Sequence, residues 1–378
     1  MNTSIPVLPS HTEVAVVGAG PTGLALAVTL ASAGIDFVLV DKQAEGANTS
    51  RAAVVHARTL EVLDELGASR ELISRGVRLT RFTVRDGARR LMTVPFDRLP
   101  TPHPYTLMVP QYETEAVLLD RLRALGGDVH RPFEVSRVTQ DDTGATLTMT
   151  SGETLRAHYV VGADGMHSAV REASGIGFSG GSYAESFVLA DVVMDWAPGP
   201  EEVSLTFGPA GLLVVAPLPG GRYRIVATAD HAPENPDLPF VQRLLDERAP
   251  GQGAITGLVW SSRFRLQHRV ADHYRAGRLF LAGDAAHVHS PAGGQGMNTG
   301  IQDGYALGRA FASDTLDGYE AQRRPVAERV VAFADRMTRI ATTRNTTARR
   351  LRNVALRLLG HTGFRTKLAT ELAELDYR

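Results

Sequence analysis

Cysteine is absent from the 378-residue sequence, which excludes disulfides, cysteine nucleophiles, Cys-ligated zinc and iron–sulfur clusters. Neither sign of charge dominates, because the formal net charge is −1, and a near-neutral chain gives no general indication of nucleic-acid binding. Long apolar runs are lacking too. The longest, LLVVAPL at residues 212–218, is far shorter than the roughly 20 residues that span a bilayer. The composition therefore predicts a globular protein without a nucleic-acid or membrane partner.

The N-terminal residues MNTSIPVLPSHTE have neither the basic segment nor the apolar run of a secretory signal, so we expect a cytoplasmic protein. Charge is uneven only near the end. Residues 321–378 hold 13 Lys or Arg against 5 Asp or Glu. This segment is either a helical tail with a solvated basic face or a surface that attracts an anionic partner or cosubstrate.

The first chemical motif is GAGPTG, at residues 18–23. An apolar strand precedes it, a helix-forming stretch follows to Gly34, and a second apolar strand, FVLV, leads to Asp41. Gly18 permits a tight turn, Gly20 lets the backbone approach a pyrophosphate, and Gly23 lets helix and strand pack closely. The helix N-terminus offers N–H groups to phosphates, and Asp41 can accept from ribose hydroxyls. The pattern predicts dinucleotide binding but does not distinguish FAD from NAD(P).

Two later segments have the same pattern, an apolar strand followed by a turn that carries an aspartate. The first is GADGMHSAVR at residues 162–171, and the second is RLFLAGD at residues 278–284. The second continues into AAHVHSPAGGQGMN and then into a helix expected from about Thr299. With GAGPTG, these segments resemble the class A flavoprotein monooxygenases, the single-component aromatic hydroxylases that include para-hydroxybenzoate hydroxylase and the polyketide and phenol hydroxylases.

The resemblance implies FAD as the bound cofactor and NADPH or NADH as a transient cosubstrate, because only one nucleotide-binding βαβ unit is visible. It implies hydroxylation of an aromatic substrate, of phenolic or polyketide type, with O₂ through a flavin C4a-hydroperoxide. Baeyer–Villiger oxidation, epoxidation and a flavin-binding protein that does not transfer oxygen remain alternatives. The oligomeric state is left open between monomer and homodimer.

The residues that the resemblance assigns to the cofactor come from five parts of the chain. Asp41 stands where the family usually has Glu, so its reach is one methylene shorter. Asp284 is expected to bind the ribityl chain, and the N–H groups after Gln295 are expected to face the flavin ring. The full set is Gly18, Gly20, Pro21, Thr22, Gly23, Asp41, Lys42, Arg51, Arg58, Gln111, Asp164, Asp284, Pro291, Gly294, Gly296, Met297 and Asn298.

Two histidines stand in the flavin loop, His287 and His289. Their spacing of two differs from the i, i+4 pair of a helical zinc site, and no third ligand stands at a recognisable distance, so we expect no metal. His287 is interpreted as a structural hydrogen bonder. His289, a base that titrates near neutral pH, is the candidate catalytic residue.

The expected fold is α/β. A Rossmann-like FAD-binding domain (1–78, 105–180 and 272–335) carries an inserted β-sheet substrate domain (79–104 and 181–271). A helical C-terminal segment (336–378) follows, interrupted at residues 361–363. The inserted sheet is expected from strands at 79–84, 90–94, 186–193, 202–207, 212–216, 223–229 and 258–266.

Overall fold

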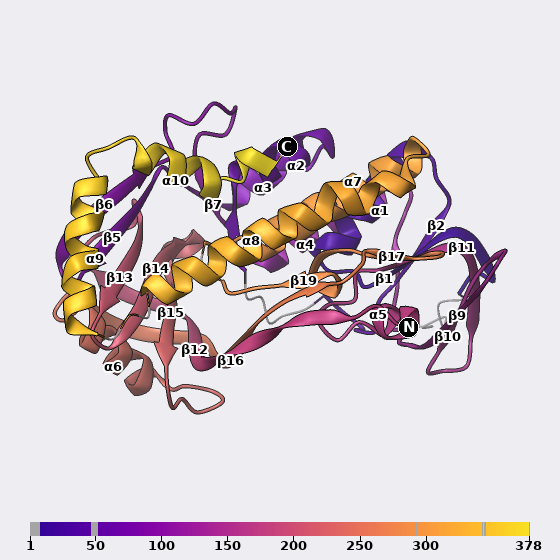
Figure 1. Cartoon of the computed structure of the whole chain (residues 1–378). Coiled ribbons are helices and arrows are strands. Elements are labelled where there is room, and N and C mark those ends of the chain that lie inside the picture. The colour runs from indigo at the N-terminus through magenta and orange to yellow at the C-terminus, as the bar shows by residue number, and fades with distance from the viewer. Residues whose placement is uncertain (1–7, 47–51, 292, 342, 344, 378) are drawn as a thin grey trace.

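The computed structural model describes residues 8–46, 52–291, 293–341, 343 and 345–377. Two large sheets and a three-stranded one organise the chain (Figure 1). Among these described residues, no helix is both long and apolar enough to cross a bilayer.

The first sheet has the strand order β17-β18-β11-β1-β2-β8, and β10 and β9 extend it from β11. Its central strands β18, β11, β1, β2 and β8 are parallel. Val14, Ala15 and Val16 of β1 are fully buried, as expected for a parallel strand covered on both faces. The strands are β1 (His11–Val17), β2 (Phe37–Val40), β8 (Val129–His130), β9 (Val135–Asp141), β10 (Gly144–Met149), β11 (Thr154–Gly162), β17 (Arg275–Ala276) and β18 (Leu279–Leu281).

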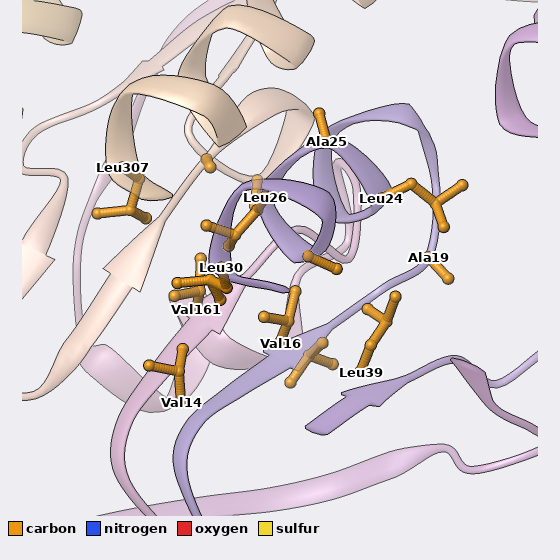
Figure 2. Close-up of a cluster of buried hydrophobic side chains, with 14 of the residues drawn as sticks. Val14, Val16, Ala19, Leu24, Ala25, Leu26, Leu30, Leu39, Val161 and Leu307 are labelled. Carbon is orange, nitrogen blue, oxygen red and sulfur yellow. The ribbon is translucent and has the colours of Figure 1, made fainter. Parts of the chain in front are cut away.

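Helix α1 (Pro21–Ala33) packs on this sheet and contacts both α4 (Gln111–Ala124) and α7 (Gly296–Ala312). Figure 2 shows the shared core, in which side chains of β1, β2 and β11 face those of α1, with Leu307 of α7 beside them. Pro21 begins the helix, where its missing N–H costs nothing, and Gly34 ends it with a left-handed φ of 70°. Each fully buried leucine here contributes roughly 1.5–3 kcal/mol.

The second sheet has the order β19-β16-β12-β15-β14-β13-β5-β6, and helix α6 (Leu238–Arg248) packs against it. Its long strands β12 and β16 are antiparallel partners over most of their length. The strands are β5 (Arg81–Asp86), β6 (Arg89–Pro95), β12 (Phe178–Trp196), β13 (Val203–Gly208), β14 (Gly211–Leu218), β15 (Arg222–Ala229), β16 (Gly253–Ala271) and β19 (His287–Val288). A third sheet holds β3 (Val54–Val55), β7 (Thr106–Met108) and β4 (Val77–Leu79).

The remaining helices lie around the two large sheets. Helix α8 runs diagonally across the molecule, α9 lies beside β5, β6 and β13, and α10 returns toward α2 (Figure 1). They are α2 (Ala57–Glu65), α3 (Ser69–Arg75), α5 (Ala169–Ser174), α8 (Tyr319–Ala341), α9 (Thr346–Leu359) and α10 (Phe364–Leu372), with 3₁₀ turns η1 (Pro219–Gly221), η2 (Gly283–Ala285), η3 (Leu316–Gly318) and η4 (Leu375–Tyr377).

The mixed α/β architecture agrees with the expected class, while the proposed domain boundaries stay a prediction. Each strand expected for the inserted sheet overlaps an observed one. The helix expected from about Thr299 begins three residues earlier, at Gly296. The C-terminal segment was expected to break only at 361–363, but α8 also ends at Ala341. The next helix begins after Asn345, whose side chain caps it by accepting from the Ala348 N–H at 3.0 Å.

Candidate active site

The glycine-rich turn after β1 has room for a ligand at one of its three glycines. An added Cβ at Gly18, where φ is +100°, would lie 2.3 Å from the Ala163 carbonyl oxygen, and one at Gly23 would lie 1.9 Å from the Gly18 oxygen. These two glycines are therefore required by packing. A Cβ at Gly20 would meet no atom of the described residues within 4 Å. The open space at Gly20 faces the start of α1, whose N-terminus has no side-chain cap.

Asp41 shapes this turn from the end of β2. One carboxylate oxygen accepts from the Ala19 N–H at 2.7 Å, and the other accepts from the Gln43 N–H at 2.8 Å. The shorter aspartate thus reaches the turn backbone directly. Lys42, next along the chain, is exposed. Ribose binding by Asp41 and cofactor contact by Lys42 remain predictions.

Helix α7 brings a second N-terminus to the same place. A line of glycines along α7 faces α1: an added Cβ at Gly300 would lie 2.4 Å from Thr22 Oγ1, and one at Gly304 would lie 2.4 Å from the Thr22 carbonyl oxygen. Gly283, just before Asp284, is as close, with its added Cβ 2.3 Å from Thr22 Oγ1. The start of α1, the start of α7 and the turn that carries Asp284 therefore meet around Thr22.

Electrostatics at this meeting point favour an anion. The N-cap residue of α7, Gln295, makes no side-chain cap hydrogen bond, so both converging helices present uncapped N–H groups and positive dipole ends. The Asp284 side chain is exposed in η2, at the end of β18, where it can accept from hydroxyl groups. These N–H donors suit the phosphates of a ligand, and this carboxylate acceptor suits a chain of hydroxyl groups.

Asp164, at the end of β11, has a clear local role. Its Oδ2 accepts from the Ala169 N–H at 2.8 Å and from the Val170 N–H at 3.4 Å, which caps the start of α5. Burial raises the pKa of its carboxyl. A contact of Asp164 with the cofactor stays a prediction beside this structural role.

The loop before α7 is held by buried polar contacts. The Asn298 side chain accepts from the His56 N–H at 2.8 Å and donates to the Val54 and Gly294 carbonyls at 2.9 and 2.8 Å. His56 Nε2 donates to the Gly293 carbonyl at 2.7 Å, and burial lowers the pKa of its imidazole to about 4. A neutral His56 thus fixes the loop without adding charge. Pro291 is exposed, and Met297 and Gly296 are half-buried at the helix start.

His287 belongs to a buried network of hydrogen bonds and ion pairs. Its Nε2 donates to Asp303 Oδ2 at 2.6 Å, and Arg323 Nε donates to Asp303 Oδ1 at 2.6 Å. Burial alone would raise the pKa of Asp303, but the positive charge of Arg323 and the hydrogen bonds from His287 and Arg323 outweigh it and lower that pKa. No group of three or more His, Asp or Glu that could hold a metal occurs in the part of the chain that the structure describes.

His289, the candidate base, points into the loop. Its Nδ1 donates to the Ser290 carbonyl at 2.8 Å, and burial lowers the pKa of its imidazole to about 4. Nε2 therefore carries a lone pair at neutral pH, and a Cβ added at Gly296 would lie 3.7 Å from it. The ring is in the protonation state that a base needs, but its catalytic role stays a prediction.

Of three further predicted cationic or polar residues, two have partners of their own in the structure and the third lies outside the described residues. Gln111, at the start of α4, donates from Nε2 to Glu115 at 2.8 Å. Arg58 pairs with Glu61 at 2.8 Å and lines a pocket of about 340 Å³ with Tyr305 and Arg309, against the middle of α7. Arg51 lies outside the described residues. Flavin contacts of all three remain predictions.

Sequence reasoning missed an ion pair in the second sheet that reaches the loop before β3. Arg224 donates to Asp191 twice, at 2.8 and 2.9 Å, and both side chains are buried. Arg224 Nη1 also donates to the Ala52 carbonyl at 2.9 Å, and Trp260 Nε1 donates to Asp191 at 3.0 Å. Asp191 is the register partner of Arg224 on β15 and of Trp260 on β16, so charged residues inside otherwise apolar strands were the available signal.

The C-terminal turn was missed as well. Glu374 is fully buried behind α7, with a φ of 61° that is unusual for a non-glycine residue. Gln302 Nε2 donates to its carboxyl, and the neighbouring Ala373 carbonyl accepts from the Arg58 N–H at 3.1 Å. Burial raises the pKa of Glu374 to about 8. The residues around Glu374 therefore hydrogen-bond both α2 and α7.

Replacing Glu374 with glutamine should flatten the dependence of stability on pH. The folded pKa of about 8 exceeds the ordinary value of 4.5, so the stability linked to this carboxyl is complete below pH 4.5 and is lost as pH rises to 8. Between these pH values the free energy of unfolding falls by about 1.4 kcal/mol per pH unit, and a neutral glutamine removes this dependence. Denaturant unfolding at pH 5 and pH 8 measures the effect. Glu371→Gln, on the same turn, is the control and should keep the wild-type difference.

Comparisons with known proteins decide which cofactor this geometry serves. The sequence model of the FAD binding domain family matches residues 11–334. The chain belongs to the class A FAD-dependent aromatic hydroxylases. It is 36% identical over 354 residues to the 6-methylpretetramide 4-monooxygenase of Streptomyces rimosus, covering 89% of this chain and 63% of that protein. With the pentachlorophenol 4-monooxygenase of Sphingobium chlorophenolicum it shares 32% identity over 345 residues, covering 84% of this chain and 63% of that protein.

Among solved structures, the chain resembles p-nitrophenol 4-monooxygenase of Pseudomonas putida, with a TM-score of 0.88 and 26% identity. That match covers 97% of this chain and 99% of the other. The two curated relatives are longer, and the chain spans less than two thirds of their length. The uncapped helix starts, the open space at Gly20 and the exposed Asp284 fit FAD, because an ADP half and a ribityl chain match those donors and that acceptor.

Proposed function

We propose that this hydroxylase uses NAD(P)H and O₂ to hydroxylate a small aromatic molecule of phenolic or polyketide type. The observation that carries the proposal is the convergence of the GAGPTG turn, the Asp284 turn and the start of α7 around Thr22. The names of the relatives support it, since they are monooxygenases of a pretetramide and of a chlorinated phenol.

The protein's part in this reaction is binding, orientation and electrostatics. When bound, FAD would supply the redox chemistry, which is electron transfer from NAD(P)H and activation of O₂. The start of α1 would hold the pyrophosphate, and Asp284 would accept from ribityl hydroxyls. The uncapped start of α7 would stabilise negative charge at its N–H groups. The second sheet, tied to the loop before β3 through Arg224 and Ala52, would position the substrate side.

The purified chain tests this proposal directly. We expect a yellow protein that releases FAD on denaturation and oxidises NADPH or NADH faster when a suitable phenol is added. The product should carry one more oxygen atom by mass spectrometry, and NMR should place it as a ring hydroxyl. A lactone or an epoxide would point to the alternative oxygenations, and H₂O₂ without any oxygenated product would contradict oxygen transfer.

Replacing Asp284 with alanine should weaken FAD binding about ten- to hundredfold while the chain stays folded. The exposed carboxylate would make charge-assisted hydrogen bonds worth roughly 1.5–3 kcal/mol. Titration of the apoprotein with FAD, followed by flavin fluorescence, measures the change. Asp142→Ala, at an exposed turn between β9 and β10, is the control. Equal FAD affinity in the two variants would contradict the assignment of Asp284 to the ribityl chain.

Replacing His289 with alanine should slow hydroxylation or divert it to H₂O₂, while reduction of the flavin survives. A positioned base typically contributes about 10²–10⁴-fold, and the lowered pKa keeps this imidazole neutral. Oxygen uptake, H₂O₂ and product are measured together, with the exposed His158→Ala as control, and EDTA should leave activity intact. Full coupled turnover in His289→Ala would remove the base role, and loss of activity on chelation that a divalent metal restores would overturn the metal-free site.

A further inference from the structure

Helix α9 turns its apolar side outward. Leu351, Val354 and Leu358 are 67%, 56% and 66% exposed, and their spacing of three and four residues places them on one face. A surface helix normally buries this stripe. Phe364, at the start of the next helix α10, is a further large hydrophobic side chain with 39% exposure. These four residues are most of the seven large exposed hydrophobic side chains among the described residues.

The opposite face of α9 is the one fixed to the protein. Arg352 donates to the Ile340 carbonyl at 3.0 Å and to the Phe207 carbonyl at 3.3 Å. Asn353 donates to Asp86 at 2.7 Å. The helix lies at the outer border of the molecule beside β5, β6 and β13 (Figure 1). Its orientation is therefore set by specific polar contacts, and the apolar stripe faces away from them.

Charge along the segment that carries the stripe has a single sign. From Arg336 to Thr370 the sequence has nine Lys or Arg and no Asp or Glu. Arg350 and Arg357 each precede a stripe leucine by one position and so line one edge of the stripe, and both are exposed. Arg365 and Lys367 are exposed on the neighbouring α10. An apolar stripe whose own segment holds cations and no acid is the pattern of a helix that lies in an anionic lipid interface.

We propose that the outer face of α9, with the start of α10, docks on an anionic lipid surface. A second copy of the chain fits less well, because antiparallel pairing of α9 with its symmetry mate would bring Arg350 and Arg357 against their counterparts. An anionic lipid surface, in contrast, attracts a cation at any position along this segment. Of the 23 residues from Asn345 to Lys367, 17 are exposed, so the docking face is continuous. The proposal is independent of the hydroxylase reaction and concerns peripheral attachment.

Cosedimentation of the full chain with vesicles tests the proposal. We expect binding to phosphatidylcholine vesicles that contain phosphatidylglycerol, no binding to phosphatidylcholine alone, and release by high salt. Each cation near the surface contributes about fivefold, so the double variant Arg350→Gln/Arg357→Gln should bind about 25-fold more weakly. The double variant Leu351→Gln/Leu358→Gln should lose most binding, because it removes the inserted side chains.

The matched control changes exposed apolar residues elsewhere. Val193→Gln/Val259→Gln alters side chains that are 45% and 49% exposed on β12 and β16, and it should bind vesicles like the wild type. Light scattering after size exclusion reports the mass of each variant in parallel. No binding to anionic vesicles, or equal binding by the α9 variants and the control, overturns the proposal. A wild-type dimer that dissociates in Leu351→Gln/Leu358→Gln, without vesicle binding, also overturns it and assigns the face to a second copy.

Discussion

Asp303→Ala should destabilise the folded protein by about 3–5 kcal/mol. The carboxylate has no exposed surface, and its two oxygens accept from Arg323, His287 and the Gly283 N–H at 2.6, 2.6 and 3.2 Å. Removing it leaves the Arg323 guanidinium buried without its counter-charge, which is the costly way to break a buried ion pair. Urea unfolding of wild type and variant measures the difference in the free energy of unfolding.

The same substitution should also reduce FAD retention, because Asp303 holds Gly283 and Gly283 positions the Asp284 turn. The control is Asp317→Ala. That carboxylate is 99% exposed, pairs with Arg275 and should contribute less than about 1 kcal/mol. Similar unfolding midpoints for the two variants would mean that the buried network does not stabilise this part of the fold.

The parts of the site that the sequence predicted are those set by local backbone geometry. The GAGPTG turn is specified within a few residues: Gly18 requires a positive φ and Gly23 requires close approach, so the motif itself carries the structure. The start of α7 was predicted within three residues for a similar reason, because a glycine-rich loop before an amphipathic stretch marks a helix N-terminus.

Contacts between distant segments were not predicted, because they depend on register and on packing angles. Gly300 and Gly304 give no local signal for the close approach of α7 to Thr22, although both leave space that Thr22 fills. Glu374 resembles an ordinary tail residue in the sequence, and only the fold places it behind α7. The break after Ala341 was missed because the favourable side-chain cap at Asn345 outweighed a helical pattern that looked continuous.

The contact of Arg224 with the Ala52 carbonyl is another contact between distant segments. Replacing Arg224 allows its effect on stability and its effect on flavin binding to be measured separately. Arg224→Met should destabilise the fold by about 3–5 kcal/mol, because Asp191 would stay buried without its counter-charge and would keep the Trp260 N–H as its donor. The double variant Asp191→Leu/Arg224→Met should recover most of that loss, since apolar residues often replace a buried ion pair at little cost. Thermal or urea unfolding of both variants measures this.

The double variant should still bind FAD about tenfold or more weakly than the wild type, because the link from β15 to the Ala52 carbonyl is gone. That link is a charge-assisted hydrogen bond of 2.9 Å, and such bonds are worth roughly 1.5–3 kcal/mol. Arg222→Met, two residues earlier on β15, removes a guanidinium that hydrogen-bonds the Pro219 carbonyl of its own turn and should leave FAD affinity unchanged. If the double variant regains both stability and wild-type FAD affinity, Arg224 acts only within the sheet and does not position the loop before β3.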